Sequence, residues 1–230
     1  MKILAFDTCF DGCSVCVAEL RGAAVVALSS RMERFETGHA ERLIPMIGEA
    51  MDEAQVAFGD LDRIATTVGP GTFTGTRIGI AAARSIALAT NAPTVGVSSL
   101  AVMAEVARRT TDAETLAVVT DARRGEVYAQ LFSGRVDRNA DSEPVLLPID
   151  SAAQIGGRGA ITFVGSGAVA VAEGAVRHGR DARAALPDLL PDAVALASIA
   201  AGLEASDQPL APFYLRPPDA KPQDKATARV

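Results

Sequence analysis

The sequence predicts an α/β protein made of two related halves, each with a mixed sheet that begins as an antiparallel meander. Residues 4–20 and 116–132 share one order of features: a hydrophobic strand that ends in aspartate, a turn with glycine, and an alternating strand. Residues 67–71 and 162–167 share another, in which a strand ends in G-x-G before a helix. Because both patterns recur in the same order, we expect the second half to repeat the first.

The first half is predicted to open with three strands and one amphipathic helix. Glycine-containing turn signals separate the strands, which we expect over residues 2–8, 14–20 and 23–32. Apolar residues then recur at three- and four-residue steps over residues 39–54, which is typical of a helix with one buried face. Pro45 inside this helix predicts a late start or a kink.

The first half continues as alternating strands and helices. We expect strands over residues 63–68 and 93–97, and helices over residues 75–89 and 99–109. The polar residues 109–114 then indicate a junction between the halves.

The second half is predicted to be the smaller one. Where the first half has its amphipathic helix, the second has irregular sequence with Pro144 and Pro148. We therefore expect a first domain over residues 1–110 and a smaller second domain over 111–215, followed by a disordered tail over 216–230 that is rich in proline, lysine and aspartate. A final helix at about 192–205 fits on either half.

Composition excludes several classes of function. The 230 residues carry a net charge of −6, which argues against an independent nucleic-acid footprint. Only two histidines are present, so there is little material for a histidine-rich metal site or a catalytic triad. No apolar run is long enough to span a membrane, and Asp7 interrupts the stretch that a signal peptide would need, so we expect a cytoplasmic protein.

All three cysteines lie within eight residues, at Cys9, Cys13 and Cys16. A zinc site would need a fourth ligand, and no other cysteine or histidine lies nearby in the sequence. We interpret the three as small buried residues in a reducing compartment, with a metal or redox role as the less favoured alternative.

The glycine-rich segment GPGTFTGTRIG at residues 69–79 is the strongest candidate for chemistry. Glycines between a strand and a helix let backbone N–H groups approach a phosphate, and the helix N-terminus adds positive potential. The candidate phosphate or nucleotide site, expected to bind weakly, consists of Asp7, Thr8, Gly69, Gly71 and Asp121. The alternative is structural: a tight turn with close helix packing, and aspartates that cap turns at strand ends.

Four strings resemble one known family. HAERLIPMI at 39–47, VGPGTFTGTRIG at 68–79, VGVSSL at 95–100 and DARRGEVY at 121–128 are similar to the TsaB (YeaZ) family, and the resemblance extends to residue 216. It implies the fold of the actin/Hsp70/sugar-kinase ATPase superfamily, which is ribonuclease H-like, with two related domains.

The resemblance implies a non-catalytic subunit that binds TsaD and acts with TsaE. That machinery transfers a threonylcarbamoyl group to N6 of adenosine 37 in tRNAs that read codons starting with A, and tRNA is expected to bind only through the assembled complex. Catalytic TsaD has a metal-binding H-x-x-x-H, whereas the matching positions here are Ser99 and Met103. No intrinsic cofactor or metal is expected, and ATP or ADP is expected only weakly or in the complex. The alternatives are an independent small actin-fold ATPase or a glycoprotease-like peptidase.

The resemblance places the contact with TsaD, or with a second copy of the chain in a homodimer, on the helices at 39–54 and 75–89. Glycine and alanine at four-residue steps form a stripe on the second helix that permits a close helix contact. The expected interface residues are His39, Leu43, Met46, Ile47, Ala50, Gly75, Gly79 and Ala83. The alternative, favoured for Leu43 and Ile47, is that both helices only cover their own sheet.

Overall fold

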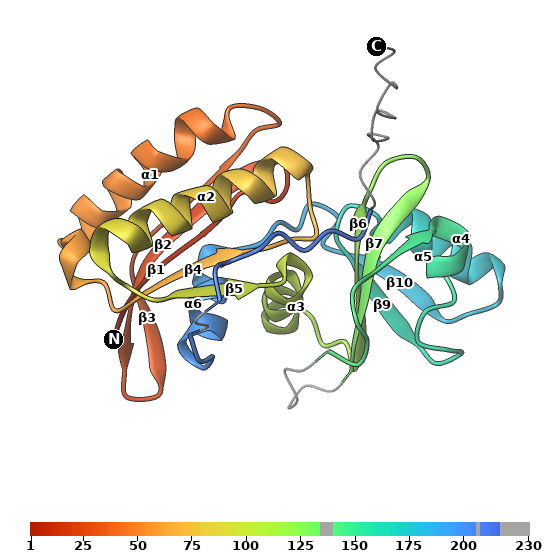
Figure 1. The fold of residues 1–230 in the computed structure, drawn as a ribbon. Helices are drawn as coiled ribbons and strands as arrows, with labels where there is room; N and C mark the ends of the chain where they lie inside the picture. Colours follow the sequence, from red (N-terminus) through yellow and green to blue (C-terminus); the bar gives the residue numbers. More distant parts are fainter. Residues whose placement is uncertain (134–139, 206–207, 217–230) are drawn as a thin grey trace, which may run out of the picture.

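The computed structural model describes residues 1–133, 140–205 and 208–216, which form two five-stranded sheets side by side (Figure 1). The first sheet has the order β3-β2-β1-β4-β5. Its strands are β1 (Lys2–Asp7), β2 (Gly12–Arg21), β3 (Ala24–Arg34), β4 (Arg63–Thr67) and β5 (Thr94–Val97). Strands β1, β2 and β3 pair antiparallel, and β1, β4 and β5 pair parallel, so the predicted meander and mixed sheet are confirmed.

Helices cover both faces of the first sheet. Helices α1 (His39–Ala54) and α2 (Phe73–Thr90) pack on one face, and their apolar side chains share a core with β1, β2 and β4. Helices α3 (Ser99–Thr110) and α6 (Ala193–Ala201) lie on the other face, and α6 contacts every strand of the sheet. Because β1 is central and covered on both sides, five of its six residues are buried, which explains its continuous apolar sequence.

The second sheet has the order β10-β9-β6-β7-β8, the same connectivity as the first. Its strands are β6 (Thr115–Asp121), β7 (Glu126–Ser133), β8 (Val145–Pro148), β9 (Ile161–Val164) and β10 (Ala182–Ala185). Helices α4 (Ile149–Ala152) and α5 (Ala168–Arg177) cover one face. The four-residue α4 occupies the place that the 16-residue α1 has in the first half. The second half is therefore smaller, as predicted, because this helix is short.

The fold class expected from the sequence, two related α/β halves with mixed sheets, is confirmed by this matched topology. Helix α1 begins at His39 and continues through Pro45, so the late start expected from that proline is wrong. The short elements β8, α4, β10 and the 3-10 turn η1 (Phe58–Asp60) were not predicted, because three or four residues give no readable periodicity where no clear apolar run or turn signal marks them.

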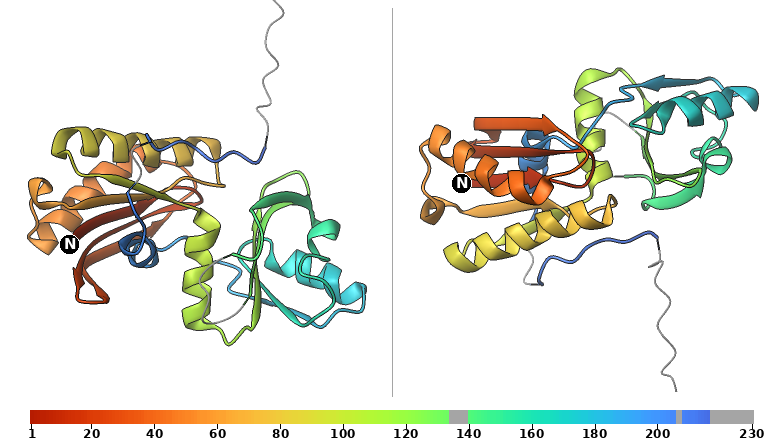
Figure 2. Two further views of the ribbon diagram at one scale, coloured as in Figure 1. Left: turned by 60° about the horizontal axis from the view of Figure 1, so that its bottom comes forward. Right: turned by 90° about the horizontal axis from the view of Figure 1, so that it is seen from above.

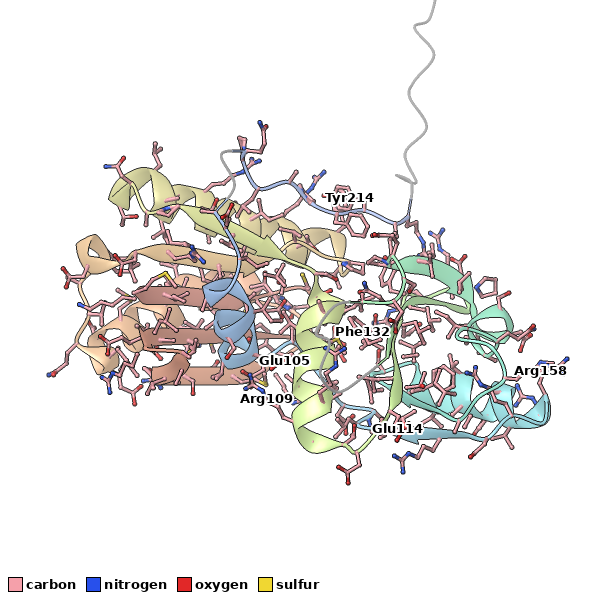
Figure 3. The ribbon with its side chains drawn as sticks, turned by 90° about the horizontal axis from the view of Figure 1, so that it is seen from below. Glu105, Arg109, Glu114, Phe132, Arg158 and Tyr214 are labelled. Carbon is pink, nitrogen blue, oxygen red and sulfur yellow. The ribbon has the colours of Figure 1, made fainter. Side chains whose placement is uncertain are left out.

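Helix α3 connects the halves and is buried between them (Figure 3). Val102 faces the first sheet, whereas Leu100, Met103, Ala104 and Ala107 pack against the second sheet. Two segments after β10 also return to the first half. One is α6, for which the sequence left either half open, and the other is the C-terminal segment 208–216, which we call the strap (Figure 2).

The expected disordered tail falls outside the described residues except for Arg216. Within the described ranges, no helix combines the length and the apolar character that crossing a membrane requires.

Candidate functional site

A cleft of about 810 Å³ lies between the two halves. Its walls are the turn after β1, the loop from β4 to α2, the turn from β6 to β7, residues 187–190 and the end of the strap. Of the five residues predicted for a phosphate or nucleotide site, only Gly71 and Asp121 line this cleft. Asp7 and Thr8 lie behind the wall, at the end of β1 and directly after it, and Gly69 is buried against the strap.

Asp7, the last residue of β1, is 3 % exposed. The Thr67 hydroxyl donates a hydrogen bond to Asp7 Oδ1, and the Cys9 backbone N–H donates to the same oxygen over 3.2 Å. Burial outweighs these hydrogen bonds and raises the pKa of Asp7 to about 6. A carboxyl group that is buried and away from the cleft wall is poorly placed to hold a hydrated cation for a ligand there.

The loop from β4 to α2 packs on the turn that follows β1. A side chain at Gly71 would place its Cβ 2.5 Å from the Cys9 carbonyl oxygen, and a Cβ at Gly75 would collide with the Thr8 carbonyl oxygen. The Thr8 hydroxyl donates to the Gly75 carbonyl over 2.6 Å. These glycines therefore permit the chain to approach itself, and the structural alternative for Gly71 and Thr8 is supported over a phosphate cradle.

Asp121 lies across the cleft, at the end of β6. Its carboxylate accepts the Arg123 N–H over 2.8 Å and forms a longer ion pair of 3.8 Å with the Arg123 guanidinium. Its own backbone N–H donates to the Ser166 hydroxyl over 2.9 Å. Asp121 thus shapes the exposed turn between β6 and β7. The two aspartates of the predicted site, Asp7 and Asp121, occupy equivalent strand ends but very different surroundings.

The buried hydroxyl of Thr120 is a feature of the cleft that the sequence did not reveal. Thr120 lines the cleft and is 1 % exposed. Within the part of the chain that the structure describes, its Oγ1 has no hydrogen-bond partner. No pattern in the sequence separates this threonine from other threonines in strands.

The predicted interface residues are all buried inside the monomer, so their expected role as partner contacts is wrong. They pack under α1 and α2 or directly against β1 and β4: His39, Leu43, Met46, Ile47, Ala50, Gly75, Gly79 and Ala83. The spacing of these residues marks the inward face of α1 and α2, because a periodic apolar stripe on a helix first covers the sheet beneath it.

The outward face of the same helices carries exposed apolar side chains. Ile44 on α1 is 55 % exposed and Leu88 on α2 is 85 % exposed. Ala40 and Pro45 on α1 and Ala81 on α2 are exposed as well. A helical projection that marks apolar residues outside the buried stripe would have found Ile44 and Leu88.

The small-residue stripe on α2 leads to a stability prediction. A Cβ at Gly79 would lie 2.8 Å from Thr8 Oγ1 and 3.0 Å from Thr66 Oγ1. We expect Gly79→Leu to lower the free energy of unfolding by about 1–3 kcal/mol, because the helix must move off its sheet. Urea denaturation measures this, with Ala81→Leu on the exposed side of α2 as the matched control. Equal stability of the two variants would contradict the packing described here.

The cysteines are free and buried, in agreement with their predicted structural role. Cys9 donates its thiol proton to the Thr67 hydroxyl over 3.2 Å, and burial raises the pKa of Cys9 far above its usual value. Burial also raises the pKa values of Cys13 and Cys16 to about 12. Thiols with such pKa values are poor nucleophiles and poor metal ligands at neutral pH.

The two positions that would correspond to metal-binding histidines are structural here. The Ser99 hydroxyl donates to the Pro70 carbonyl over 2.5 Å, and Met103 is fully buried against the second sheet. Among the described residues, no group of three or more histidine, cysteine, aspartate or glutamate side chains is arranged to hold a metal ion.

Comparisons with known proteins agree on one family. The family model "TsaD: tRNA N6-adenosine threonylcarbamoyltransferase" matches residues 33–145. The tRNA threonylcarbamoyladenosine biosynthesis protein TsaB of Escherichia coli is 34% identical over 151 residues, which cover 64% of this chain and 63% of that protein. An uncharacterized protein of Mycobacterium tuberculosis is 35% identical over 222 residues, covering 96% of this chain and 94% of that protein.

A solved structure gives the same result over most of the chain. YeaZ from Pseudomonas aeruginosa superposes with a TM-score of 0.76 at 32% sequence identity, covering 93% of this chain and 99% of that one. Because this match combines high coverage with identity above 30%, the chain belongs to the TsaB (YeaZ) family.

Proposed function

We propose that this chain is a non-catalytic subunit of the machinery that makes threonylcarbamoyladenosine in tRNA. It binds TsaD and acts with TsaE, and TsaD transfers the threonylcarbamoyl group to N6 of adenosine 37 in tRNAs that read codons starting with A. The observation that carries this proposal is membership of the TsaB family combined with buried, structurally engaged side chains at the positions of Ser99 and Met103.

The surroundings of the reactive side chains support a non-catalytic role. The three thiols are buried with raised pKa values, and the Asp7 carboxyl is hydrogen-bonded behind the cleft wall. A peptidase of the glycoprotease type needs an exposed nucleophile, base or metal, and these groups do not provide one.

A surface on α1 and α2 supports binding to a partner. We define the partner surface as the exposed small and apolar residues of the two helices: Ala40, Ile44, Pro45, Ala81, Ser85 and Leu88. Both helices pack on the same face of the first sheet, so this surface points away from the protein (Figure 1). It replaces the buried residues first expected there, and the exposure of Ile44 and Leu88 leaves them available for contact with a partner.

The same surface serves a homodimer when TsaD is absent. A stable and specific contact of either kind buries roughly 1,200–2,000 Å² in total. We expect the purified chain to dimerise and the dimer to dissociate as TsaD is added, because the two contacts compete for one surface. Analytical ultracentrifugation measures this, and a dimer that persists in the TsaD complex would contradict it.

We propose that tRNA binds only through the assembled complex, since the chain carries a net charge of −6. One observation favours a second candidate, a nucleotide-binding protein: the cleft between related halves holds the unpartnered Thr120 hydroxyl within the described residues. We expect ATP or ADP to bind weakly or only in the complex. Tight binding of ATP by the isolated chain in isothermal titration would favour an independent ATPase.

Reconstitution tests the proposed function. Purified TsaD, TsaE, tRNA and the small-molecule donors are combined with and without this chain, and threonylcarbamoyladenosine is quantified in the digested tRNA. We expect modification to require the chain, and we expect the chain alone to give neither modification nor proteolysis. Full modification without the chain would contradict the proposal.

A further inference from the structure

The strap, residues 208–216, crosses the gap between the two sheets along a path separate from α3 (Figure 2). Its first part is anchored in the first half. Leu210 is 6 % exposed in the core under α2, and the Arg84 guanidinium donates to its carbonyl oxygen. The Phe213 N–H then donates to the Val68 carbonyl over 2.7 Å, immediately after β4.

The strap is fitted closely to the glycine loop. Gly69 has a φ of +106°, and a Cβ there would lie 2.8 Å from the Phe213 carbonyl oxygen. Both the backbone conformation and the close approach therefore require glycine at this position. The role of Gly69 is thus to receive the strap, and this role differs from the phosphate binding expected from the sequence.

Aromatic and cationic side chains hold the next residue of the strap. The Tyr214 ring stacks on Phe73 with 5.6 Å between ring centroids, and Arg77 Nε donates to the Tyr214 hydroxyl over 2.6 Å. The Arg77 guanidinium lies 3.6 Å from the centroid of the Phe73 ring. Tyr214 lies at the point where the strap reaches the gap between the halves (Figure 3).

Arg216 attaches the end of the strap to the second half. Its Nη2 forms a 2.6 Å ion pair with Glu126 Oε2 on β7 and lies 3.5 Å from the Arg123 carbonyl oxygen. The two paired side chains are 22 % and 33 % exposed, so the pair is partly shielded from water. The strap thus contacts both walls of the cleft, whereas α3 joins the halves through its apolar contacts elsewhere.

We propose that the strap is a conformational latch that fixes the opening of the cleft, with the Arg216–Glu126 ion pair as its catch. Helix α3 and the connection from β10 to α6 also join the halves, and such contacts resist separation of two sheets but still permit small sliding and rotation of one against the other. A further connection at a different place restricts that freedom. A binding partner that draws Arg216 away from Glu126 would therefore release the second half to move. This inference does not depend on the partner surface or on the proposed function.

Distance measurements between the halves test the latch. Ala81→Cys on α2 and Ala170→Cys on α5 provide exposed sites for two spin labels, and the three native cysteines are buried and react slowly. Pulsed electron–electron double resonance on the full chain then gives the distribution of distances between the two spin labels. We expect a narrow distribution in the parent and a distribution at least twice as wide in Arg216→Ala.

Two further variants make the result specific. Arg21→Ala removes an ion pair of the same 2.6 Å length, with Glu19; both residues are on β2 and neither lines the cleft. We expect it to leave the distribution unchanged. The exchange Arg216→Glu with Glu126→Arg restores the pair, and we expect it to narrow the distribution again. Both ion pairs are partly exposed and contribute little to the free energy of folding, so these variants should fold, as circular dichroism would verify. An Arg216→Ala distribution as narrow as the parent's, or equal broadening in Arg21→Ala, would overturn the latch.

Discussion

The chain with both Ile44→Glu and Leu88→Glu is expected to fold normally and to lose about 100-fold in affinity for TsaD, because two apolar contacts of roughly 1–2 kcal/mol each sum to about 3 kcal/mol and every 1.4 kcal/mol is tenfold. The two side chains are 55 % and 85 % exposed, so the monomer does not need them for its core. In the complex, each new carboxylate would be desolvated without a partner. Isothermal titration with purified TsaD measures the loss.

Two exposed valines on α5 provide the matched control. Val169 and Val176 are 48 % and 55 % exposed on the second half, away from the partner surface. Val169→Glu with Val176→Glu adds the same two charges, and we expect wild-type affinity. If both double variants weaken binding equally, or if neither does, the contact with TsaD lies on another face.

Asp7→Asn is expected to stabilise the protein at neutral pH. Burial raises the pKa of Asp7 to about 6, above its ordinary value in the unfolded chain, so the folded state holds the proton more tightly. Stability contributed by this group is therefore present below about pH 4 and is lost as the pH rises to about 6, by up to about 3 kcal/mol. The asparagine amide still accepts the Thr67 and Cys9 hydrogen bonds without a charge.

Urea denaturation of both proteins at pH 4 and pH 7.5 measures this effect. We expect Asp7→Asn to exceed the parent by about 1–3 kcal/mol at pH 7.5 and by little at pH 4. Asp121→Asn, on the exposed turn after β6, controls for the loss of one negative charge. A parent that is more stable than Asp7→Asn at pH 7.5 would show that the carboxylate has a favourable partner in solution.

The long elements could be predicted from the sequence because their patterns are long. The alternation in β2 and the three- and four-residue steps in α1 extend over 10 and 16 residues, and each element begins and ends close to its predicted bounds. The strand β8 and helix α4 have four residues each, and their formation depends on pairing with β7 and packing on α5. Such contacts between distant residues leave no local pattern.

The candidate site was harder to predict because glycines serve several purposes. The spacing of Gly69, Gly71 and Gly75 is compatible with a phosphate-binding loop and with close packing of the chain on itself. The deciding facts are the nearby carbonyl oxygens of Phe213, Cys9 and Thr8, which come from the strap and the first turn. The stripes of apolar and small residues on α1 and α2 are likewise compatible with a partner contact and with packing on the chain's own sheet. The predicted interface was therefore assigned to the buried face of these helices.

Modification of tRNA in the reconstituted system, compared between two variants, tests the central claim most directly. The claim is that the chain acts through its partner surface and contributes no catalytic group. With TsaD and TsaE present, Asp7→Asn should support threonylcarbamoyladenosine formation at the wild-type rate, whereas Ile44→Glu with Leu88→Glu should support almost none. The reverse result, an inactive Asp7→Asn beside an active surface variant, would contradict the account and would place chemistry at the buried carboxyl group.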